Sequence, residues 1–499
     1  MVHYLRKGIG ERVPIVEPSE APSNVFSKEP IPMTGPINLA TILRKEGYDA
    51  FVFKEGLVGR EMSDEELVKC NVLLLSLMTS TYERGVEYAI RYRRLRAEAG
   101  LESRVIAGGI HPSMMPEEAA AVFDQVVIGE AETIIADILE GEKKGRIIKG
   151  ERHDDLDSVV PIPNFELVEG WENMHIFPVM TSRGCPYECN FCSVTEMFGR
   201  KYRFHSPERV MQELKNLEKL FKEHESTSFF RRHFYRDRIL LADDNFTANL
   251  VRANDILDRM IASGYNRKLL CQARAEIAKH PELVAKMQRA GIDVVCVGCE
   301  SINPQTLEHM NKRQTVEDII RAAEVFHDNG LQMLGMFILG SDDDTKDVFK
   351  MTSDFCHKHK IPFVQYSILT PLPGTSFYKD MEKQGRLLHK KGDHKKWDYY
   401  DGMHAVFQPK NMTAVELQEG MMECYNNFYS FGNFVREVGK YVAQSARALF
   451  TGNSPSFHPA KYQLVGAHIK RKWLQLNQEY LNYLANEPKA NTPFGESLV

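Results

Sequence analysis

Apolar and polar positions alternate in blocks over the first 150 residues of the chain. Four short runs are almost wholly apolar, at residues 50–53, 72–77, 104–109 and 125–129. The sequence between them is charged and has a helical period, as in residues 82–99. Continuous apolar strands separated by helices are typical of a parallel sheet that is covered on both faces. The pattern therefore predicts a doubly wound, Rossmann-like α/β domain.

A second alternation follows residues 151–174, a stretch rich in aspartate and proline that is typical of a linker. Six strand-like runs, each continued by helical sequence, lie at 175–184, 238–244, 268–276, 293–301, 332–340 and 363–371. Six β-α units predict a parallel barrel, and the number favours an incomplete barrel over one of eight strands. Later sequence is mainly helical. We expect domains at 1–150, 175–385 and 386–499.

Composition narrows the class of protein. The chain has 499 residues, of which 43% are hydrophobic and 26% charged, as in globular proteins of several domains. Its net charge of −5 predicts no general attraction to nucleic acid. The first residues contain no apolar signal segment, and no apolar run approaches the roughly 20 residues that span a bilayer. We expect a cytoplasmic protein.

Three of the nine cysteines lie close together in a single loop. Cys185, Cys189 and Cys192 directly follow the first strand of the predicted barrel, after an Arg-Gly pair that lets the backbone turn. A structural zinc site needs four protein ligands, and only a distant residue would complete one here. An iron-sulfur cluster held by three cysteines leaves one iron open for chemistry. The other six cysteines are scattered, as expected of small buried side chains.

The CxxxCxxC motif after the first strand of a partial barrel resembles the radical S-adenosylmethionine superfamily, over about residues 175–385. The resemblance implies that the cysteines hold a 4Fe-4S cluster whose fourth iron binds S-adenosylmethionine. Reduction by a donor such as flavodoxin or ferredoxin then yields a 5'-deoxyadenosyl radical. Phe191, next to Cys192, lies where members of the family carry an aromatic residue near the adenine. Residues on or near later strands match further cofactor-binding positions of the family: Asp243, Asp244, Asn245, Gln272, Arg274, Glu300, Ser301, Gly335, Gly340 and Thr370.

Together, the two predicted domains resemble the cobalamin-binding subfamily, a group that includes hopanoid methylases and the anaerobic magnesium-protoporphyrin ester cyclase. The resemblance implies cobalamin between the domains, on the carboxyl edge of the first sheet. The matching loop residues are Ser76, Thr79, Ser80, Gly108, Gly109, His111, Gly129 and Glu130. The Asp-x-His-x-x-Gly motif that supplies a cobalt ligand in other proteins does not occur. Some members hold cobalamin without a protein ligand, and others have lost it.

The resemblance implies methylation of an unactivated carbon on a small hydrophobic molecule, lipid-like or polycyclic. The methyl group would pass from S-adenosylmethionine through cobalamin to a substrate radical. The alternative is radical cyclisation, oxidation or carbon-carbon coupling without methyl transfer, with or without cobalamin. A third, non-enzymatic interpretation is a redox or iron sensor.

The region after the barrel supplies candidates on the substrate side. The segment Asp-Tyr-Tyr-Asp-Gly-Met-His resembles a recurrent segment of the subfamily and marks Tyr399, Tyr400, Asp401 and His404. His389, His394 and Trp397 are weaker candidates, since a loop rich in Lys and His is more often a solvated surface. Residues 428–450 have an apolar helical face, and residues 468–473 are basic and aromatic. Packing against the barrel is the favoured interpretation, with peripheral contact at the inner membrane surface as the alternative.

Overall fold

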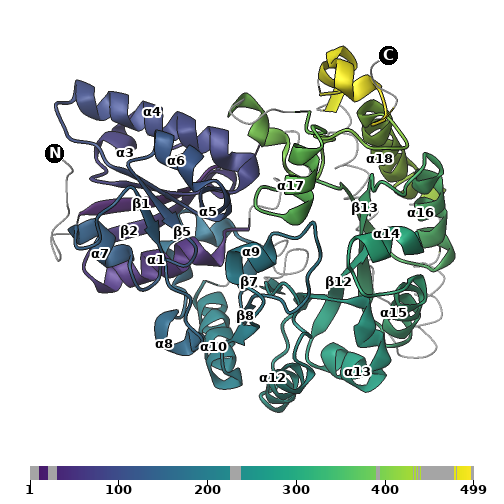
Figure 1. The fold of residues 1–499 in the computed structure, drawn as a ribbon. Coiled ribbons are helices and arrows are strands. Elements are labelled where there is room, and N and C mark those ends of the chain that lie inside the picture. The colour runs from purple at the N-terminus through teal and green to yellow at the C-terminus, as the bar shows by residue number, and fades with distance from the viewer. Residues whose placement is uncertain are drawn as a thin grey trace.

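Two parallel sheets of six strands each organise the chain, as Figure 1 shows. This computed structural model describes residues 11–20, 31–224, 238–388, 394–430, 432, 433, 435, 439, 477, 478 and 480–495. Most of the tail segments predicted at 428–450 and 468–473 lie outside the described residues, as does His389. Within the described part of the chain, no helix is long and apolar enough to cross a membrane.

The first sheet has the strand order β2-β1-β3-β4-β5-β6. Its strands are β1 (Arg12–Glu17), β2 (Asp49–Lys54), β3 (Leu73–Ser76), β4 (Val105–Gly108), β5 (Gln125–Ile128) and β6 (Ile147–Lys149). The four predicted strands are present, but β1 and β6 were missed by the sequence pattern. Pro14 lies within β1, and proline inside a run of residues argues against an inner strand. In the structure Pro14 pairs in register with Phe51 of β2, so the pattern was misleading there.

Helices cover both faces of this sheet, as expected of a doubly wound domain (Figure 1). They are α1 (Thr34–Lys45), α2 (Glu55–Val58), α3 (Asp64–Val68), η2 (Thr79–Thr81), α4 (Tyr82–Glu98), α5 (Ile110–Met114), α6 (Pro116–Val122) and α7 (Ile135–Glu140). Helices α1 and α7 contact each other, as do α3 and α4. The strand order reverses between β1 and β3, the point at which open α/β sheets bind their ligands.

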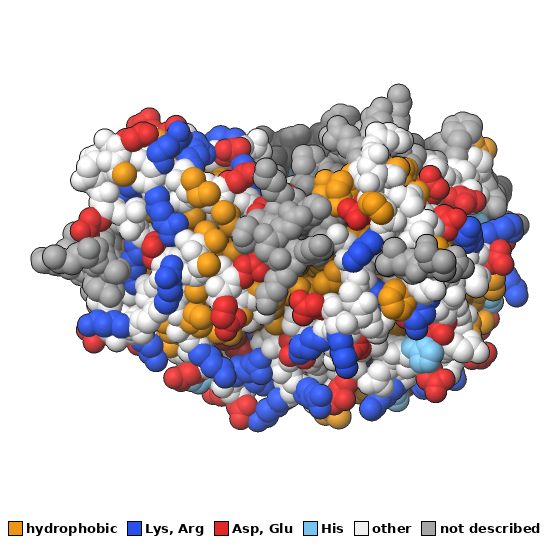
Figure 2. Space-filling view, turned by 45° about the horizontal axis from the view of Figure 1, so that its top comes forward, with side chains coloured by type: hydrophobic (Ala, Val, Ile, Leu, Met, Phe, Trp, Pro, Cys, Tyr) orange, Lys and Arg blue, Asp and Glu red, His pale blue; other side chains and the backbone are white. Residues whose placement is uncertain are grey.

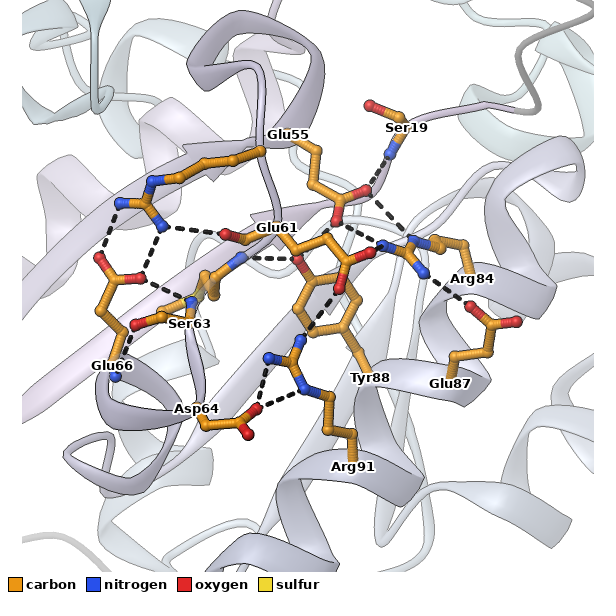
Figure 3. Close-up of polar contacts among 12 residues, drawn as sticks. Ser19, Glu55, Glu61, Ser63, Asp64, Glu66, Arg84, Glu87, Tyr88 and Arg91 are labelled. Carbon is orange, nitrogen blue, oxygen red and sulfur yellow. Dashed lines mark hydrogen bonds and ion pairs between the residues drawn. The ribbon is translucent and has the colours of Figure 1, made fainter.

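A network of charges fixes the carboxyl ends of β1 and β2 (Figure 3). Glu55 is buried directly after β2, and its carboxylate accepts hydrogen bonds from the hydroxyl of Tyr88 at 2.6 Å and from Arg84 at 3.2 Å. The backbone N–H of Ser19, beyond β1, donates to the same carboxylate at 2.7 Å. Protein side chains therefore occupy the carboxyl ends of β1 and β2. A ligand can approach this edge of the sheet at the ends of β3, β4 and β5.

The second sheet has the order β14-β13-β12-β11-β10-β7, an open parallel sheet. Its strands are β7 (Ile176–Val179), β10 (Arg238–Leu241), β11 (Leu269–Ala273), β12 (Ile292–Glu300), β13 (Gln332–Leu339) and β14 (Phe363–Ile368). The helical segments are α9 (Val194–Phe198), α10 (Pro207–Glu223), α12 (Leu250–Ala262), η5 (Ala275–Lys279), α13 (Pro281–Arg289), α14 (Pro304–His309), α15 (Val316–Asp328), α16 (Asp347–Lys358) and α17 (Ser376–Lys383). The predicted incomplete barrel is confirmed.

The first predicted barrel strand is interrupted. Residues 175–184 form β7 and then β8 (Ser182–Arg183), which pairs antiparallel with β9 (Arg203–Phe204). The Asp243 carboxylate accepts hydrogen bonds from the backbone N–H groups of Thr181, at 2.6 Å, and Ser182, at 2.7 Å. These contacts turn the chain away from the sheet immediately before the cysteine loop.

A helix after the barrel covers the open edge of β14. Helix α18 (Ala414–Phe428) brings Tyr425 to the edge, where its hydroxyl accepts from the N–H of Tyr366 at 3.0 Å and donates to its carbonyl at 2.8 Å. The Tyr429 hydroxyl makes the same two contacts with Val364. Since unpaired strand edges invite further strand pairing, these tyrosines explain how a six-stranded sheet can end there.

Linker residues between the sheets form α8 (Leu156–Val159), η3 (Phe165–Leu167) and η4 (Trp171–Asn173). A groove of about 670 Å³ lies between α1, residues 162–167 and α10. Glu213 of α10 is buried at this groove, with one carboxylate oxygen 2.8 Å from Arg209. Burial raises the pKa of Glu213 to about 7, although Arg209 opposes the shift.

The Glu213 carboxyl makes a testable contribution to stability. Between pH 5 and 7 the unfolded chain loses this proton while the folded protein keeps it, so the free energy of unfolding should fall as pH rises. We expect Glu213→Gln to remove on the order of 2 kcal/mol of this dependence between pH 5 and 8. Urea denaturation across that pH range measures the free energy of unfolding. Glu223→Gln is the control, because Glu223 is exposed. Identical pH profiles for wild type and Glu213→Gln would contradict the expectation.

Candidate functional site

The carboxyl edge of the first sheet faces the second half of the molecule. Thr34 of α1 contacts the sulfur of Met180, after β7, at 3.7 Å. A Cβ placed on Gly374, after β14, would lie 2.5 Å from the sulfur of Met114 in α5. Figure 2 shows hydrophobic side chains on both sides of this boundary, around atoms that are not described. Ligands held at the two carboxyl edges would therefore be neighbours.

The cysteine loop is held firmly on both sides. Asn190 donates to the carbonyl of His309 at 2.9 Å, and Asn311 donates to the carbonyl of Glu188 at 2.8 Å. The carbonyl of Asn190 also accepts from the N–H of Phe377 in α17. These contacts join the loop to the end of α14 and the start of α17.

The three thiols lie close enough to influence one another's ionisation. Burial raises the pKa of Cys192 to about 12, and the charges of Cys189, Asp244 and Cys185 add to the shift. Burial likewise raises the pKa of Cys185. Metal binding requires thiolates and releases these protons. Among the described residues, no group of three or more Cys, His, Asp or Glu side chains is arranged so that it could hold a single metal ion. A 4Fe-4S cluster differs from such a site because each cysteine binds a different iron, and the soft donor set fits it.

Two cations lie beside the loop. The guanidinium of Arg274 stacks on the ring of Tyr187, 3.8 Å from its centre, and donates to the carbonyl of Lys312. The ammonium of Lys312 lies 2.5 Å from the carboxylate of Glu300, and both side chains are 8% exposed. Burial alone would lower the pKa of Lys312, but Glu300 and Cys189 keep it raised. Arg274 also pairs with Glu276 at 2.8 Å, so each of the two cations beside the loop is matched by a carboxylate.

Of the two predicted carboxylates after β10, only one remains available. Asp243 is fully buried, and its oxygens accept from the backbone of residues 181 and 182, so in this structure it supports the loop. Burial raises the pKa of Asp244 to about 6, with the charge of Asp243 adding to it. The charge of Asp244 also raises the pKa of Cys185 and Cys192, so this carboxylate lies near the thiols.

Several other predicted cofactor contacts have structural roles. A Cβ on Gly335 would meet Phe337 and Ile361, which places its missing side chain in the packed layer outside the sheet. Gly340 has a φ of +97°, and its Cβ would meet Leu417 of α18. Packing therefore favours glycine at both positions, and the expected approach of their backbone to adenine stays a prediction.

The remaining predicted residues divide between turns and accessible positions. The side chains of Asn245, Ser301 and Thr370 each form a hydrogen bond with a backbone group two residues away, as in a turn. Glu300 adopts a φ of +58°, rare for a residue other than glycine, and pairs with Lys312. Gln272 is half-exposed, and Phe191 is half-buried against the core.

The concave face of the second sheet was not identified from the sequence. Alternate residues of its strands are buried against the helices, whereas those between them are half-exposed. The half-exposed positions are Leu240, Leu270, Gln272, Cys296, Leu334, Met336, Ile338, Gln365 and Ser367. Strand register places them on one face, since Gln272 pairs with Cys296 and Cys296 with Leu334. The period of two along each strand was the available signal. Apolar side chains left half-exposed inside a barrel indicate a binding surface.

The first sheet contributes small accessible residues at its edge. Ser76, Gly108 and Gly129, at the ends of β3, β4 and β5, are half-exposed. Gly109 has a φ of +99°, and a Cβ there would lie 2.6 Å from the carbonyl oxygen of Leu77, so only glycine fits. Small residues at three adjacent strand ends leave room for a flat ligand, and this edge fits the cofactor expected there.

Other residues predicted to contact cobalamin are buried in the protein. Thr79 and Ser80 are 5% and 4% exposed, and the Ser80 hydroxyl donates to Glu20 at 2.9 Å. His111 is fully buried between the rings of Tyr82, 4.1 Å away, and Trp397, 5.0 Å away. In this structure the His111 ring is therefore enclosed by protein side chains.

Glu130 also has a different environment from the one expected. It is buried and bound by Arg183, at 2.7 Å, and by Arg203. Burial opposes its ionisation, but the two arginines outweigh burial and hold the pKa of Glu130 below its usual value. Glu130 therefore forms a contact between the two halves of the molecule.

The substrate-side candidates lie where the three regions meet. Gly402 accepts a hydrogen bond from the N–H of Ile368 in β14 at 2.7 Å, and η6 (His394–Tyr399) contacts η2 and α4. The side chains of Asp401 and His404 are buried and pair at 2.9 Å. Within the described residues, His404 Nε2 and Asp401 Oδ2 have no hydrogen-bond partner. Tyr400 is buried, and only Tyr399 is partly exposed. Trp397 is also buried, donating to Glu118 at 2.8 Å.

Comparison with known proteins identifies the class. Residues 179–356 match the radical SAM superfamily, and residues 38–139 match the B12 binding domain. An uncharacterized methyltransferase of Pyrococcus horikoshii is 30% identical over 351 residues, which cover 65% of this chain and 72% of that protein. The chain therefore belongs to the radical SAM superfamily, in the group that carries a B12-binding domain, and is an enzyme.

Two further relatives have named activities. The bacteriochlorophyllide d C-12(1)-methyltransferase of Chlorobaculum tepidum is 27% identical, over 65% of this chain and 68% of that protein. The anaerobic magnesium-protoporphyrin IX monomethyl ester cyclase of Cereibacter sphaeroides is 24% identical, over 78% of this chain and 66% of that protein.

A solved structure has the same fold. The cobalamin-dependent S-adenosylmethionine radical enzyme OxsB with aqua-cobalamin bound matches with a TM-score of 0.65 and 17% identity, over 95% of this chain and 73% of that one. Family membership implies an iron-sulfur cluster, S-adenosylmethionine and cobalamin as cofactors.

Proposed function

We propose that this enzyme methylates an unactivated carbon of a hydrophobic, polycyclic or lipid-like small molecule, in a reaction that requires cobalamin. The observation that carries the proposal is the direct attachment of the first sheet's carboxyl edge to the strand that leads into the cysteine loop. A methyl donor at that edge and a radical source at the loop would act on one shared space. The methyltransferases among its relatives support the same reaction.

The chain's own residues have distinct proposed roles. When bound, the cluster supplies the electron that cleaves S-adenosylmethionine, and cobalamin supplies the methyl group. Cys185, Cys189 and Cys192 would hold the cluster, while Arg274, stacked on Tyr187 and bound to the carbonyl of Lys312, supports the loop from one side. The Asp244 carboxylate pairs with the amino group of S-adenosylmethionine, as ionic hydrogen bonds favour.

The concave face of the barrel supports an apolar substrate. Five of its half-exposed residues are aliphatic or methionine, at positions 240, 270, 334, 336 and 338. An apolar molecule bound there would cover them and exclude water from the radical. Gln365 and Ser367 on β14 supply polar contacts at one side. A substrate with an apolar body and a polar end fits this arrangement.

The decisive experiment uses anaerobically reconstituted enzyme with iron, sulfide, cobalamin and a low-potential reductant. Methylation predicts 5'-deoxyadenosine and S-adenosylhomocysteine in equal amounts. Comparing lipid and pigment extracts from cells with and without the protein identifies the substrate as the molecule that gains one methyl unit. Deoxyadenosine formation that is indifferent to cobalamin would contradict the proposal.

A second candidate is radical ring closure or oxidation without methyl transfer. The cyclase relative favours it, since that alignment covers more of this chain than those of the methyltransferases. Mass analysis of the product separates the two, because ring closure removes hydrogen atoms and adds no carbon.

Substrate binding to the concave face predicts a specific mutational effect. Met336→Asn should lower kcat/KM about 10–100-fold, since burial of a methionine side chain is worth roughly 1.5–3 kcal/mol. Iron content should not change. The matched control is Met351→Asn, because Met351 is 57% exposed on α16. Equal kcat/KM for the two variants would contradict this role for the concave face.

A further inference from the structure

Four buried charges join the two halves of the molecule. Glu130 and Glu132 follow β5, whereas Arg183 and Arg203 belong to β8 and β9. Glu130 Oε2 lies 2.7 Å from Arg183 and 3.0 Å from Arg203; Glu130 Oε1 also pairs with Arg203, and Glu132 pairs with Arg183. The four side chains are 2–7% exposed. Two carboxylates balance two guanidiniums, so the cluster is neutral as a whole, the condition under which buried charges are tolerated.

This charge cluster lies at the first residues of the cysteine loop. Arg183 is two positions before Cys185, and Gly184 between them has a φ of +86°. A Cβ on Gly184 would lie 2.6 Å from the carbonyl oxygen of Lys201 and 2.8 Å from that of Gly199. The backbone is therefore tightly packed here, and a shift of Arg183 would be transmitted to Cys185.

The other end of the loop depends on the same contacts. Helix α9 begins two residues after Cys192, and its last carbonyl groups accept hydrogen bonds from arginines. Arg203 donates to Phe198 at 3.1 Å, while Arg152 of the linker donates to Met197 at 2.8 Å and to Glu196 at 2.9 Å. Since Arg203 is itself bound to Glu130, the first half of the chain influences both ends of the loop.

We infer that Glu130 is a positioning residue that fixes the cysteine loop relative to the carboxyl edge of the first sheet, and so keeps radical formation coupled to methyl transfer. The inference rests on the proposed function. Removing the Glu130 charge leaves two buried guanidiniums with too few partners, which is costly and favours rearrangement. The thiols remain available to hold a cluster, whereas the distance between the two edges is no longer set. Misplacement of about 1 Å costs as much as 100-fold in rate, and the methyl-transfer step needs this alignment.

The test compares reconstituted wild type with Glu130→Gln, which keeps shape and removes charge. Glu117→Gln, an exposed carboxylate on α6, is the matched control. We expect Glu130→Gln to retain iron and S-adenosylmethionine cleavage, while the ratio of 5'-deoxyadenosine to methylated product rises at least about fivefold. Hydrogen exchange of residues 183–199, which does not depend on activity, should be about 10-fold faster. Glu117→Gln should match wild type in both measurements.

Two outcomes overturn the inference. One is a ratio and an exchange rate equal to those of wild type. The other is a parallel loss of iron, deoxyadenosine and product, which a purely structural role predicts. If Glu130→Gln does not fold, Glu132→Gln, which affects only the Arg183 contact, decides by the same criteria. Wild type that forms deoxyadenosine without methylated product would refute the proposed function, and the exchange measurement would still test the positioning role.

Discussion

We expect Cys192→Ala to abolish S-adenosylmethionine cleavage, with activity falling by at least about 100-fold. Loss of a residue that only supports a metal ligand costs about 10–100-fold, and loss of the ligand itself should cost more. Cys192 is half-buried, and burial raises its pKa to about 12. If the three cysteines hold the cluster as proposed, this replacement leaves it two protein ligands, Cys185 and Cys189. Iron and sulfide analysis with electron paramagnetic resonance of the reduced protein would show a lost or altered cluster.

The control for this experiment is Cys356→Ala. Cys356 is fully buried on α16, in the layer outside the barrel, and has no proposed role in cofactor binding. This variant should keep its iron and its cleavage activity, with some loss of stability from the smaller side chain. If Cys192→Ala kept the cluster while Cys356→Ala lost it, the assignment of the cluster to the loop would be wrong.

Hydrophobic periodicity predicted most of the architecture because it is a local property. All six strands of the second sheet match the predicted runs to within one residue at their starts, and the four predicted strands of the first sheet are present. The exceptions depend on distant partners. β1 contains a proline, yet it pairs with β2 on one side and β3 on the other. The first predicted strand of the second sheet ends early, at β7, because Asp243, about 60 residues later, binds the backbone that follows.

The cysteine loop was predictable from spacing, whereas the roles of individual polar residues were not. Asp243 and Asp244 are adjacent in sequence, yet one supports the loop and the other lies near the thiols. Glu130 lies on a predicted ligand loop, but its partners are 53 and 73 residues away. Sequence pattern specifies which strand end a residue occupies. Sequence pattern does not specify which charged side chains at that strand end form ion pairs within the protein and are therefore unavailable to a ligand.

Gly184→Ala should separate the geometry of the loop from its donor atoms. The substitution keeps all three cysteines, yet the new Cβ would lie 2.6 and 2.8 Å from two backbone carbonyl oxygens, distances at which the backbone must move. The φ of +86° adds a cost of about 1 kcal/mol for any residue other than glycine. We expect a cluster that assembles poorly and cleavage of S-adenosylmethionine that falls about 10–100-fold, because displacement by about 1 Å misaligns the reacting groups.

Gly264→Ala isolates the backbone contribution. Gly264 follows α12 in the same half of the molecule, has a φ of +68°, and would have no atom within 4 Å of an added Cβ. Gly264→Ala therefore has the conformational cost of a positive φ but causes no steric clash. This substitution should lower the free energy of unfolding by about 1 kcal/mol and leave the cluster intact. Equal iron content and cleavage rates in the two alanine variants would mean that the close packing at Gly184 does not position Cys185. A selective loss in Gly184→Ala would establish that thiols of the right kind and number are insufficient, and that the turn before Cys185 is part of the active site.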